Sequence, residues 1–201
     1  MNINEIELAA EISQKIAGLY AEMEEAYDKT AKAINLTCMD CPDNCCDSYF
    51  LHHTYTEWAY LWEGLNKLGA DKLAALQEKA REYILQSEAI LARGERPMLM
   101  CPLNENGLCK LYSHRMMICR LHGVPSTFTR PDGQTMKFPG CFKCQEITGD
   151  KSPATSMDRT IFFRRLVELE LGLLGQKRGS APKVKLTLAQ MIVQGPPQLP
   201  L

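Results

Sequence analysis

Apolar residues recur at helical spacing in three long stretches of the first 95 residues. Over 4–34 the apolar positions alternate steps of four and three and share one face, occupied by Ile12, Ile16, Leu19, Met23 and Tyr27. Asn4 and Glu7 have capping-box spacing, so one amphipathic helix is predicted over 4–34. We expect this stripe to pack in the core or in a helical hairpin. A surface for a protein partner is the alternative, which the shortness of the repeat disfavours.

Two further helices are predicted directly after a loop. One begins near Thr54, which has capping-box spacing to Glu57, and ends at Gly69. Its apolar residues are Trp58, Leu61, Trp62, Leu65 and Leu68. The next runs from about 71 to 93, with Leu73, Leu76, Ala80, Ile84, Leu85 and Leu91 as its expected buried set. The short link between the two predicts an antiparallel hairpin.

From 96 to 148 the periodicity fades, while Pro, Gly and Cys become frequent. The segments 127–130 and 135–138 flank a Pro-Asp-Gly-Gln turn and predict a small β-hairpin. The region is loop-rich and has few apolar residues, so we expect a metal rather than a core to hold it in shape.

One more long helix is predicted over 157–174, capped by Ser156 or Asp158 and stopped by Gly175. The apolar face of this helix holds Ile161, Phe162, Leu166, Leu169 and Leu173. The tail 176–201 is expected to be flexible, with a short candidate helix over 187–193 and prolines that are disordered or draped over the surface. The fold class predicted is mainly α, with helices around a loop-rich cysteine site and a small β-hairpin. We expect one domain over 1–201, made of a helical N-terminal region (1–95), the cysteine-rich region 96–148, the helix 156–175 and the tail.

Composition narrows the classes of function. The 201 residues are 45% hydrophobic and carry a net charge of −1, so there is no global basic field for nucleic acid. We expect no membrane span, because no stretch is long and apolar enough. The first residues do not resemble a signal peptide, so the cytoplasm, where thiols stay reduced, is the expected compartment. That expectation and the odd count of nine cysteines disfavour disulfides.

The cysteines carry the strongest chemical signal. Four of the nine, Cys38, Cys41, Cys45 and Cys46, fall within nine residues of a loop. Cys141 and Cys144 form a second C-x2-C pair like that of Cys38 and Cys41. The remaining ones are Cys101, Cys109 and Cys119. Thiolates at this density indicate a zinc site or an iron–sulfur cluster, each of which takes four ligands. Nine cysteines can fill two such sites with one spare, or one site with others acting as small buried apolar residues.

Other motifs add little or are absent. The C-x2-C-x3-C order of the first three cysteines is the reverse of the radical-SAM motif, and there is no haem, phosphate-loop or zinc-helix signature. A histidine can replace a thiolate as a ligand, although an exposed or hydrogen-bonded role is more common. The four histidines are His52, His53, His114 and His122. The cations Lys110, Arg115 and Arg120 surround Cys109 and Cys119 and can offset thiolate charge, or form ordinary surface ion pairs.

These residues together resemble a known family, the YkgJ-type cysteine-cluster proteins, described as zinc- or iron-chelating domains. The resemblance covers about 38–120 and can be extended to the Pro139-Gly140-Cys141 step. It rests on C-x2-C-x3-CC, Cys101-Pro102 and the run Cys109-x2-Tyr112-x2-Arg115-x3-Cys119-Arg120. Met116 stands where the family usually has proline, so the turn after Arg115 is expected to differ. The resemblance implies metal binding by Cys38, Cys41, Cys45, Cys46, Cys101, Cys109 and Cys119.

Three functions remain open at this stage. The first is a cytoplasmic iron–sulfur protein, with a [4Fe–4S] cluster favoured and with Tyr112, Arg115 and Arg120 tuning the site. The second is a zinc-binding structural or interaction module. The third is a protein methylase using S-adenosylmethionine, since flagellin lysine methylases carry a similar cysteine region; it rests on analogy alone.

Overall fold

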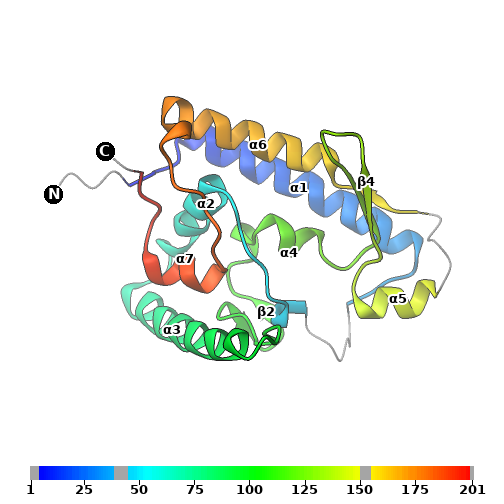
Figure 1. Cartoon of the computed structure of the whole chain (residues 1–201), viewed down its shortest axis with the longest axis horizontal. Helices are drawn as coiled ribbons and strands as arrows, with labels where there is room; N and C mark the ends of the chain where they lie inside the picture. The colour runs from blue at the N-terminus through cyan, green and yellow to red at the C-terminus, as the bar shows by residue number, and fades with distance from the viewer. Residues whose placement is uncertain (1–4, 39–44, 150–154, 200–201) are drawn as a thin grey trace.

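The computed structural model describes residues 5–38, 45–149 and 155–199. It is mainly α, as predicted. The long helices are α1 (Ala10–Ala33), α2 (Tyr55–Leu65), α3 (Ala70–Ala92) and α6 (Thr160–Leu174). The short ones are α4 (Met117–Leu121), α5 (Phe142–Thr148) and α7 (Leu188–Gln194). In Figure 1, α1 and α6 lie side by side along one edge of the molecule, α3 lies along the opposite edge, and α4 lies between them.

The first helix has the predicted face but a later start. Ile16, Leu19 and Met23 are fully buried and pack against α4 and α6. The helix begins at Ala10, and the preceding residue, Ala9, provides no side-chain cap. The capping box that was predicted with Asn4 does not start the helix: Asn4 lies outside the described residues, and Glu5 forms a β-bridge with Gln198.

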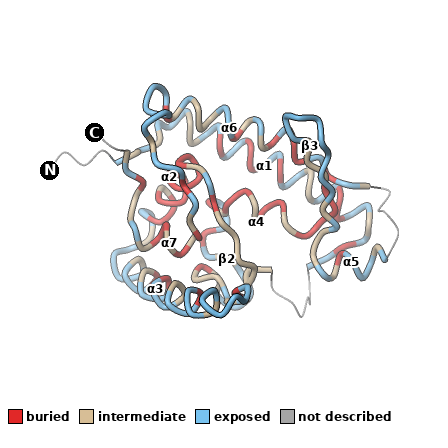
Figure 2. The backbone as a smooth tube through the Cα atoms, viewed as in Figure 1, coloured by how far each residue is buried: buried red, intermediate tan, exposed pale blue. Residues whose placement is uncertain are grey.

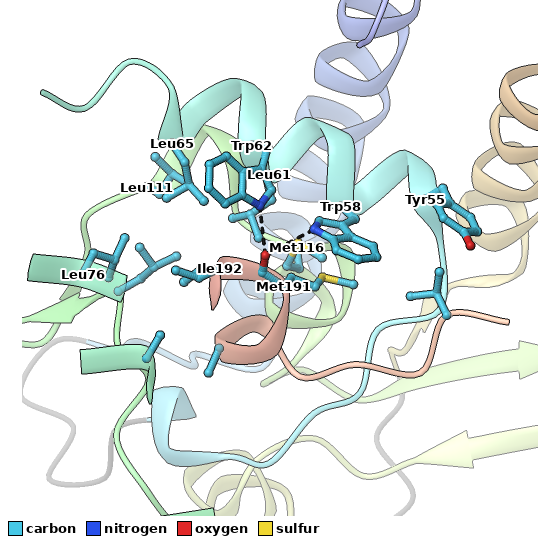
Figure 3. Close-up of a cluster of buried hydrophobic side chains, with 14 of the residues drawn as sticks. Tyr55, Trp58, Leu61, Trp62, Leu65, Leu76, Leu111, Met116, Met191 and Ile192 are labelled. Atoms are coloured by element: carbon cyan, nitrogen blue, oxygen red, sulfur yellow. Dashed lines mark hydrogen bonds between the residues drawn. The ribbon is translucent and has the colours of Figure 1, made fainter. Parts of the chain in front are cut away.

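The predicted hairpin of α2 and α3 is wrong, because α7 lies between them. The principal packing partner of α3 is α7. The indole Nε1 of Trp62 donates to the carbonyl of Met191 (2.9 Å), and that of Trp58 donates to the carbonyl of Gly195 (2.9 Å). Figure 3 shows Met191 and Ile192 inserted among the side chains of both helices. The two indoles of α2 and the apolar face of α3 are thus covered by the same short helix.

This packing also corrects the expectation of a flexible tail. Thr187 caps α7 with a complete capping box, and Ala189, Met191 and Ile192 are almost fully buried. The chain then returns to the N-terminal segment, where the amide of Ile6 donates to the carbonyl of Pro197 (2.8 Å). The apolar content of 187–193 is sufficient to bury this segment, and Figure 2 shows α7 among the buried elements.

The middle region contains the predicted β-hairpin and more. Strand β3 (Ser126–Thr129) pairs antiparallel with β4 (Thr135–Phe138) and parallel with β5 (Met157–Asp158). Because 157 and 158 are in a strand, α6 starts at Thr160, three residues later than predicted, and the Asp158 carboxylate accepts from the Thr160 amide (2.8 Å). The region also contributes to the core, contrary to expectation: its buried apolar residues are Leu103, Leu111, Met116, Met117, Leu121 and Val124.

Some residues of α3 and α6 that were predicted to be buried are exposed. Leu76 and Ala80 of α3 are buried, but Leu85 is 68% exposed. In α6, Phe162 and Leu166 are buried whereas Ile161 is 52% exposed. A helix at the surface buries only the face that packs on its neighbours, so apolar residues beyond the edge of that face remain in contact with solvent.

Candidate metal centre

Five cysteines from three segments of the chain line one small cavity of about 60 Å³, which we call the cysteine cavity. They are Cys45, Cys46, Cys101, Cys109 and Cys119. The first two lie in a single 3-10 turn, η1 (Cys45–Asp47). The others lie more than 50 residues later in the sequence: Cys101 just before a hairpin, Cys109 in that hairpin and Cys119 in a short helix. The fold therefore brings the later cysteines to the second half of the first cysteine loop.

Backbone hydrogen bonds hold the first two segments together. The amide of Cys101 donates to the carbonyl of Cys46 (2.9 Å), and Ser48 forms a β-bridge with Met98. These contacts fix the distance between the η1 turn and the chain that leads into the hairpin.

Cys109 is placed by a tight hairpin that the sequence prediction missed. Strand β1 (Asn104–Glu105) pairs with β2 (Leu108–Cys109), so that Cys109 lies opposite Asn104. The two connecting residues, Asn106 and Gly107, have φ values of 53° and 83°. Two positive φ angles in a two-residue connection are typical of a type I′ turn, for which Asn-Gly is a strong sequence signal. That dipeptide would have revealed the hairpin.

Cys119 is placed by α4, whose start is fixed by a buried carboxylate. Glu57 of α2 accepts from the amide of Met117 (2.8 Å) and from the hydroxyl of Tyr20 (3.3 Å). A carboxylate at a helix start satisfies amides that have no partner within the helix. Cys119 lies in the same short helix and therefore depends on this contact for its position.

Arg120 holds the turn that precedes α4. Its guanidinium donates to the carbonyls of Arg115 (2.8 Å), Tyr112 (2.7 Å) and Ser113 (3.0 Å). Its Cζ lies 4.5 Å from the centre of the Tyr20 ring, in a cation–π geometry. The side chain is buried and is not among the groups that line the cysteine cavity. Arg120 thus contacts the backbone that carries Arg115.

Of the three residues expected to tune the site, Arg115 is the one that lines the cavity. Burial acts to lower the pKa of its guanidinium, but the charges of Cys119, Cys45 and other thiolates outweigh burial and raise that pKa. Tyr112 is half exposed, and its hydroxyl donates to Glu24 (3.1 Å). Its ring lies 5.7 Å from the Cζ of Arg115, so it contacts the cation and not the cavity.

The thiols do not share one protonation state. A hydrogen bond from Cys45 lowers the pKa of Cys46 to about 6, and a bond from Asn104 and the charge of Arg115 act in the same direction. The same bond, together with burial, raises the pKa of Cys45. Burial raises the pKa of Cys101 and of Cys119 to about 12. Cys46 is thus the cavity cysteine whose pKa is lowered, whereas the pKa values of the other four are raised.

Backbone amides point at two of the sulfurs. The amide of Leu103 donates to the sulfur of Cys101, and the amide of Leu111 donates to that of Cys109. Each bond favours the thiolate over the thiol and so opposes the effect of burial, which leaves the pKa of both cysteines above its ordinary value. Such bonds to sulfur are one of the features that set the potential of iron–sulfur clusters.

The donor set fits a thiophilic metal, but the side chains do not stand in a coordinating arrangement. Within the described ranges, no three His, Cys, Asp or Glu side chains form a group that could hold a metal ion as they are placed. In a metal-bound state the ligand sulfurs would have to converge on a common point more closely than they do here. With bound metal, the thiols would lose their protons, since the thiolate is the ligand.

The remaining cysteines lie outside the cysteine cavity or outside the described residues. Cys38 is exposed, with its sulfur 3.8 Å from the hydroxyl of Tyr27. Burial and the charges of Cys38, Cys141 and Cys45 raise the pKa of that tyrosine. Cys144 is fully buried and its thiol donates to the carbonyl of Pro139 (3.4 Å). Cys41 falls in the stretch of the loop that the structure does not describe.

Two of the four histidines line the cysteine cavity and the other two lie outside it. His52 and His122 line the cysteine cavity, and the ring of His122 meets that of Phe50 edge to face. Burial lowers the pKa of His52 to about 4, so it is neutral and able to act as a ligand. His53 contacts the carbonyl of Val184 (3.2 Å), and His114 stacks on Tyr60 away from the cavity.

Part of the lining of the cysteine cavity could not be predicted from the sequence. Thr187, Leu188 and Ala189, at the start of α7, complete it together with Tyr83 of α3. These residues lie far from any cysteine in the sequence, and their place follows only from the insertion of α7 between α2 and α3.

No helix among the described residues has both the length and the apolar character needed to cross a membrane. Comparisons of the chain with models of protein families, with curated proteins and with solved structures gave no match.

Proposed function

We propose that this chain binds a metal centre, an iron–sulfur cluster, through the cysteines of the cysteine cavity. The observation that carries the proposal is the gathering of Cys45, Cys46, Cys101, Cys109 and Cys119 around one cavity together with Arg115. A set of sulfur donors selects iron–sulfur clusters, zinc or copper(I) over hard cations. The amides that donate to Cys101 and Cys109 and the guanidinium of Arg115 would offset the negative charge of such a cluster.

The roles of the chain's own residues follow from their places. Four thiolates would be the ligands, drawn from the five cavity cysteines and, by the resemblance to cysteine-cluster proteins, from Cys38 and Cys41 of the first loop. Arg115 would lie against the thiolates, and Arg120 would hold the turn that carries it. A cluster of this kind supplies one-electron transfer, and the proposal is a cytoplasmic protein with such a function.

Zinc is the second candidate, and a specific observation favours it. The cavity cysteines stand on very short elements: a three-residue turn, a hairpin of two-residue strands and a five-residue helix. Short elements of this kind are often held together by a tetrahedral structural zinc. The zinc would then be structural, and the chain would act as a scaffold that binds a partner protein.

Elemental analysis of protein purified without oxygen separates the two. Near-equal iron and acid-labile sulfide, with absorption in the visible range, is the result expected for a cluster. Stoichiometric zinc with no sulfide and no colour would exclude the cluster and favour the scaffold.

Matched alanine variants test the location of the site. Cys46→Ala is expected to lose most of the bound metal, because it removes one of the sulfur donors that line the cysteine cavity. Cys144→Ala serves as the control, since that thiol is bonded to Pro139 outside the cavity. Equal metal content in the two variants would place the site elsewhere.

A further inference from the structure

A second and larger cavity, of about 530 Å³, lies beside the cysteine cavity between α3 and the 102–111 segment. Its apolar lining includes Leu76 of α3 and, from the opposite wall, Leu103 and Leu111, all of which are less than a tenth exposed. We call it the lysine cavity. It shares Pro102 and Leu103 with the lining of the cysteine cavity, so the two spaces are separated by the residues that follow Cys101.

The lining of this cavity is positively charged. Lys72 and Lys79 lie seven residues apart on α3 and line one wall, and Lys110 lines the other. Glu105 is the one acidic residue in the lining, and it is paired with Lys110 (2.6 Å). Within the described ranges of the chain, neither Lys72 nor Lys79 has a carboxylate within ion-pair distance. Two lysine charges therefore remain available to an anion.

The size of the cavity indicates the kind of ligand. Cavities that bind small molecules have volumes of about 300 to 1,000 Å³ and are mainly apolar with a few polar groups. A peptide helix or strand would need a longer groove, whereas the lining here spans about two turns of α3 and one hairpin. Lysine side chains extend along apolar surface and place their charge at its rim.

We propose that the lysine cavity binds a small amphiphilic anion, such as a medium-chain carboxylate. The hydrocarbon portion lies on Leu76, Leu103 and Leu111, and the carboxylate interacts with Lys72 and Lys79 at the rim. The proposal does not depend on the metal, because no cysteine lines this cavity.

The test uses octanoate, 1-octanol and acetate, titrated into the full chain by calorimetry. Octanoate is expected to bind saturably with one molecule per chain. Octanol, which has the same tail without the charge, is expected to bind about tenfold more weakly, the size of effect that two partly exposed ion pairs give. Acetate, which has the charge without the tail, should show no saturable binding.

Three variants locate the binding. The double variant Lys72→Glu, Lys79→Glu should weaken octanoate binding by at least the factor of about ten that separates octanoate from octanol. The control Lys29→Glu, on the exposed face of α1, should leave octanoate binding unchanged. Ala75→Phe narrows the cavity from α3 without changing charge, and should abolish the binding of octanoate and of octanol together. Circular dichroism confirms that each variant is folded.

The proposal is overturned if octanoate does not saturate, if octanol binds equally well, or if the lysine variants bind as the parent does. Binding of an acidic amphipathic peptide at these lysines in place of octanoate would also overturn it, in favour of a protein partner.

Discussion

Glu57 is a carboxylate with almost no solvent contact, 5% exposed, and its ionisation opposes folding. Burial raises its pKa above the ordinary value of 4.5, although bonds from Met117, Thr54 and Tyr20 act to lower it. A folded state that holds its proton more tightly than the unfolded chain does is favoured at low pH. The contribution of Glu57 to stability is thus fully present below pH 4.5 and declines as pH rises through the folded pKa.

Glu57→Gln should remove this pH dependence while it keeps an acceptor for the amide of Met117. We expect the stability of the variant relative to the parent to increase between about pH 4.5 and 7, measured by urea unfolding at several pH values. Glu57→Ala, which leaves that amide without a partner, should cost about 1–3 kcal/mol throughout. Parallel pH curves for parent and Gln variant would show that Glu57 does not titrate in this way.

Arg120 satisfies three carbonyls of the 112–115 turn with one planar group. Lysine keeps the charge but cannot present the same fork of donors. Arg120→Lys should therefore lower the free energy of unfolding by about 1–3 kcal/mol and reduce the metal retained after a chelator challenge. Arg165→Lys, at an exposed pair with Glu22, is the control and should change stability by less than about 1 kcal/mol. Equal effects of the two substitutions would contradict a special role for Arg120.

At the scale of elements, α6 completes the start of α2. Glu170 accepts from the amides of Tyr55 (2.9 Å) and Thr56 (2.8 Å) and from the Thr56 hydroxyl (2.6 Å). These amides lie at the N-terminal end of α2, where no carbonyl within the helix reaches them. The contact fixes the orientation of α2, and with it the position of Glu57.

Glu170→Ala is expected to lower the free energy of unfolding by about 2 kcal/mol, because it leaves buried amides unsatisfied. The exposed Glu168→Ala, two residues earlier in the same helix, should change it by less than about 0.5 kcal/mol. Thermal and urea unfolding of both variants provide the comparison. A cost for Glu170→Ala no larger than that of its neighbour would mean that Thr54 alone caps α2.

The elements that the sequence predicted well are those with a long apolar repeat. The central parts of α1, α3 and α6 match their predicted ranges because burial on one side imposes a period of 3.6 residues. Helix α2 is buried on nearly all sides, and it was predicted from its apolar content and the cap at Thr54. Helix α4, with five residues, is too short to show a period. The contact of Glu170 with Tyr55 joins positions 115 apart and has no local signal. For the same reason the cysteine spacing indicated a site but did not reveal which five cysteines meet.

At the scale of the whole molecule, the buried side chains form two clusters with different relations to the cysteines. The first joins α2, α3 and α7, and Cys101, Cys109 and Cys119 pack against it. The second joins α1, α4 and α6, and includes Cys144. The cysteine cavity borders the first cluster through the start of α7. A metal there would tie segments of the first cluster to α4, which carries Cys119 and packs on α1 of the second cluster.

Removal of metal should therefore loosen one region of the molecule and not the other. Hydrogen exchange of the chelator-treated protein is expected to rise over 45–48, 101–122 and 186–190 relative to the loaded protein. The facing residues of α1 and α6, near 16–23 and 162–169, should keep their protection because these two helices pack against each other and neither carries a cavity cysteine. Cys144→Ala should show the same difference between its loaded and chelator-treated forms as the parent does. Cys46→Ala should exchange like the chelator-treated parent even before chelator is added. An equal rise over α1 and α6 would show that the two clusters open together, and an unchanged 186–190 would show that α7 does not depend on the metal.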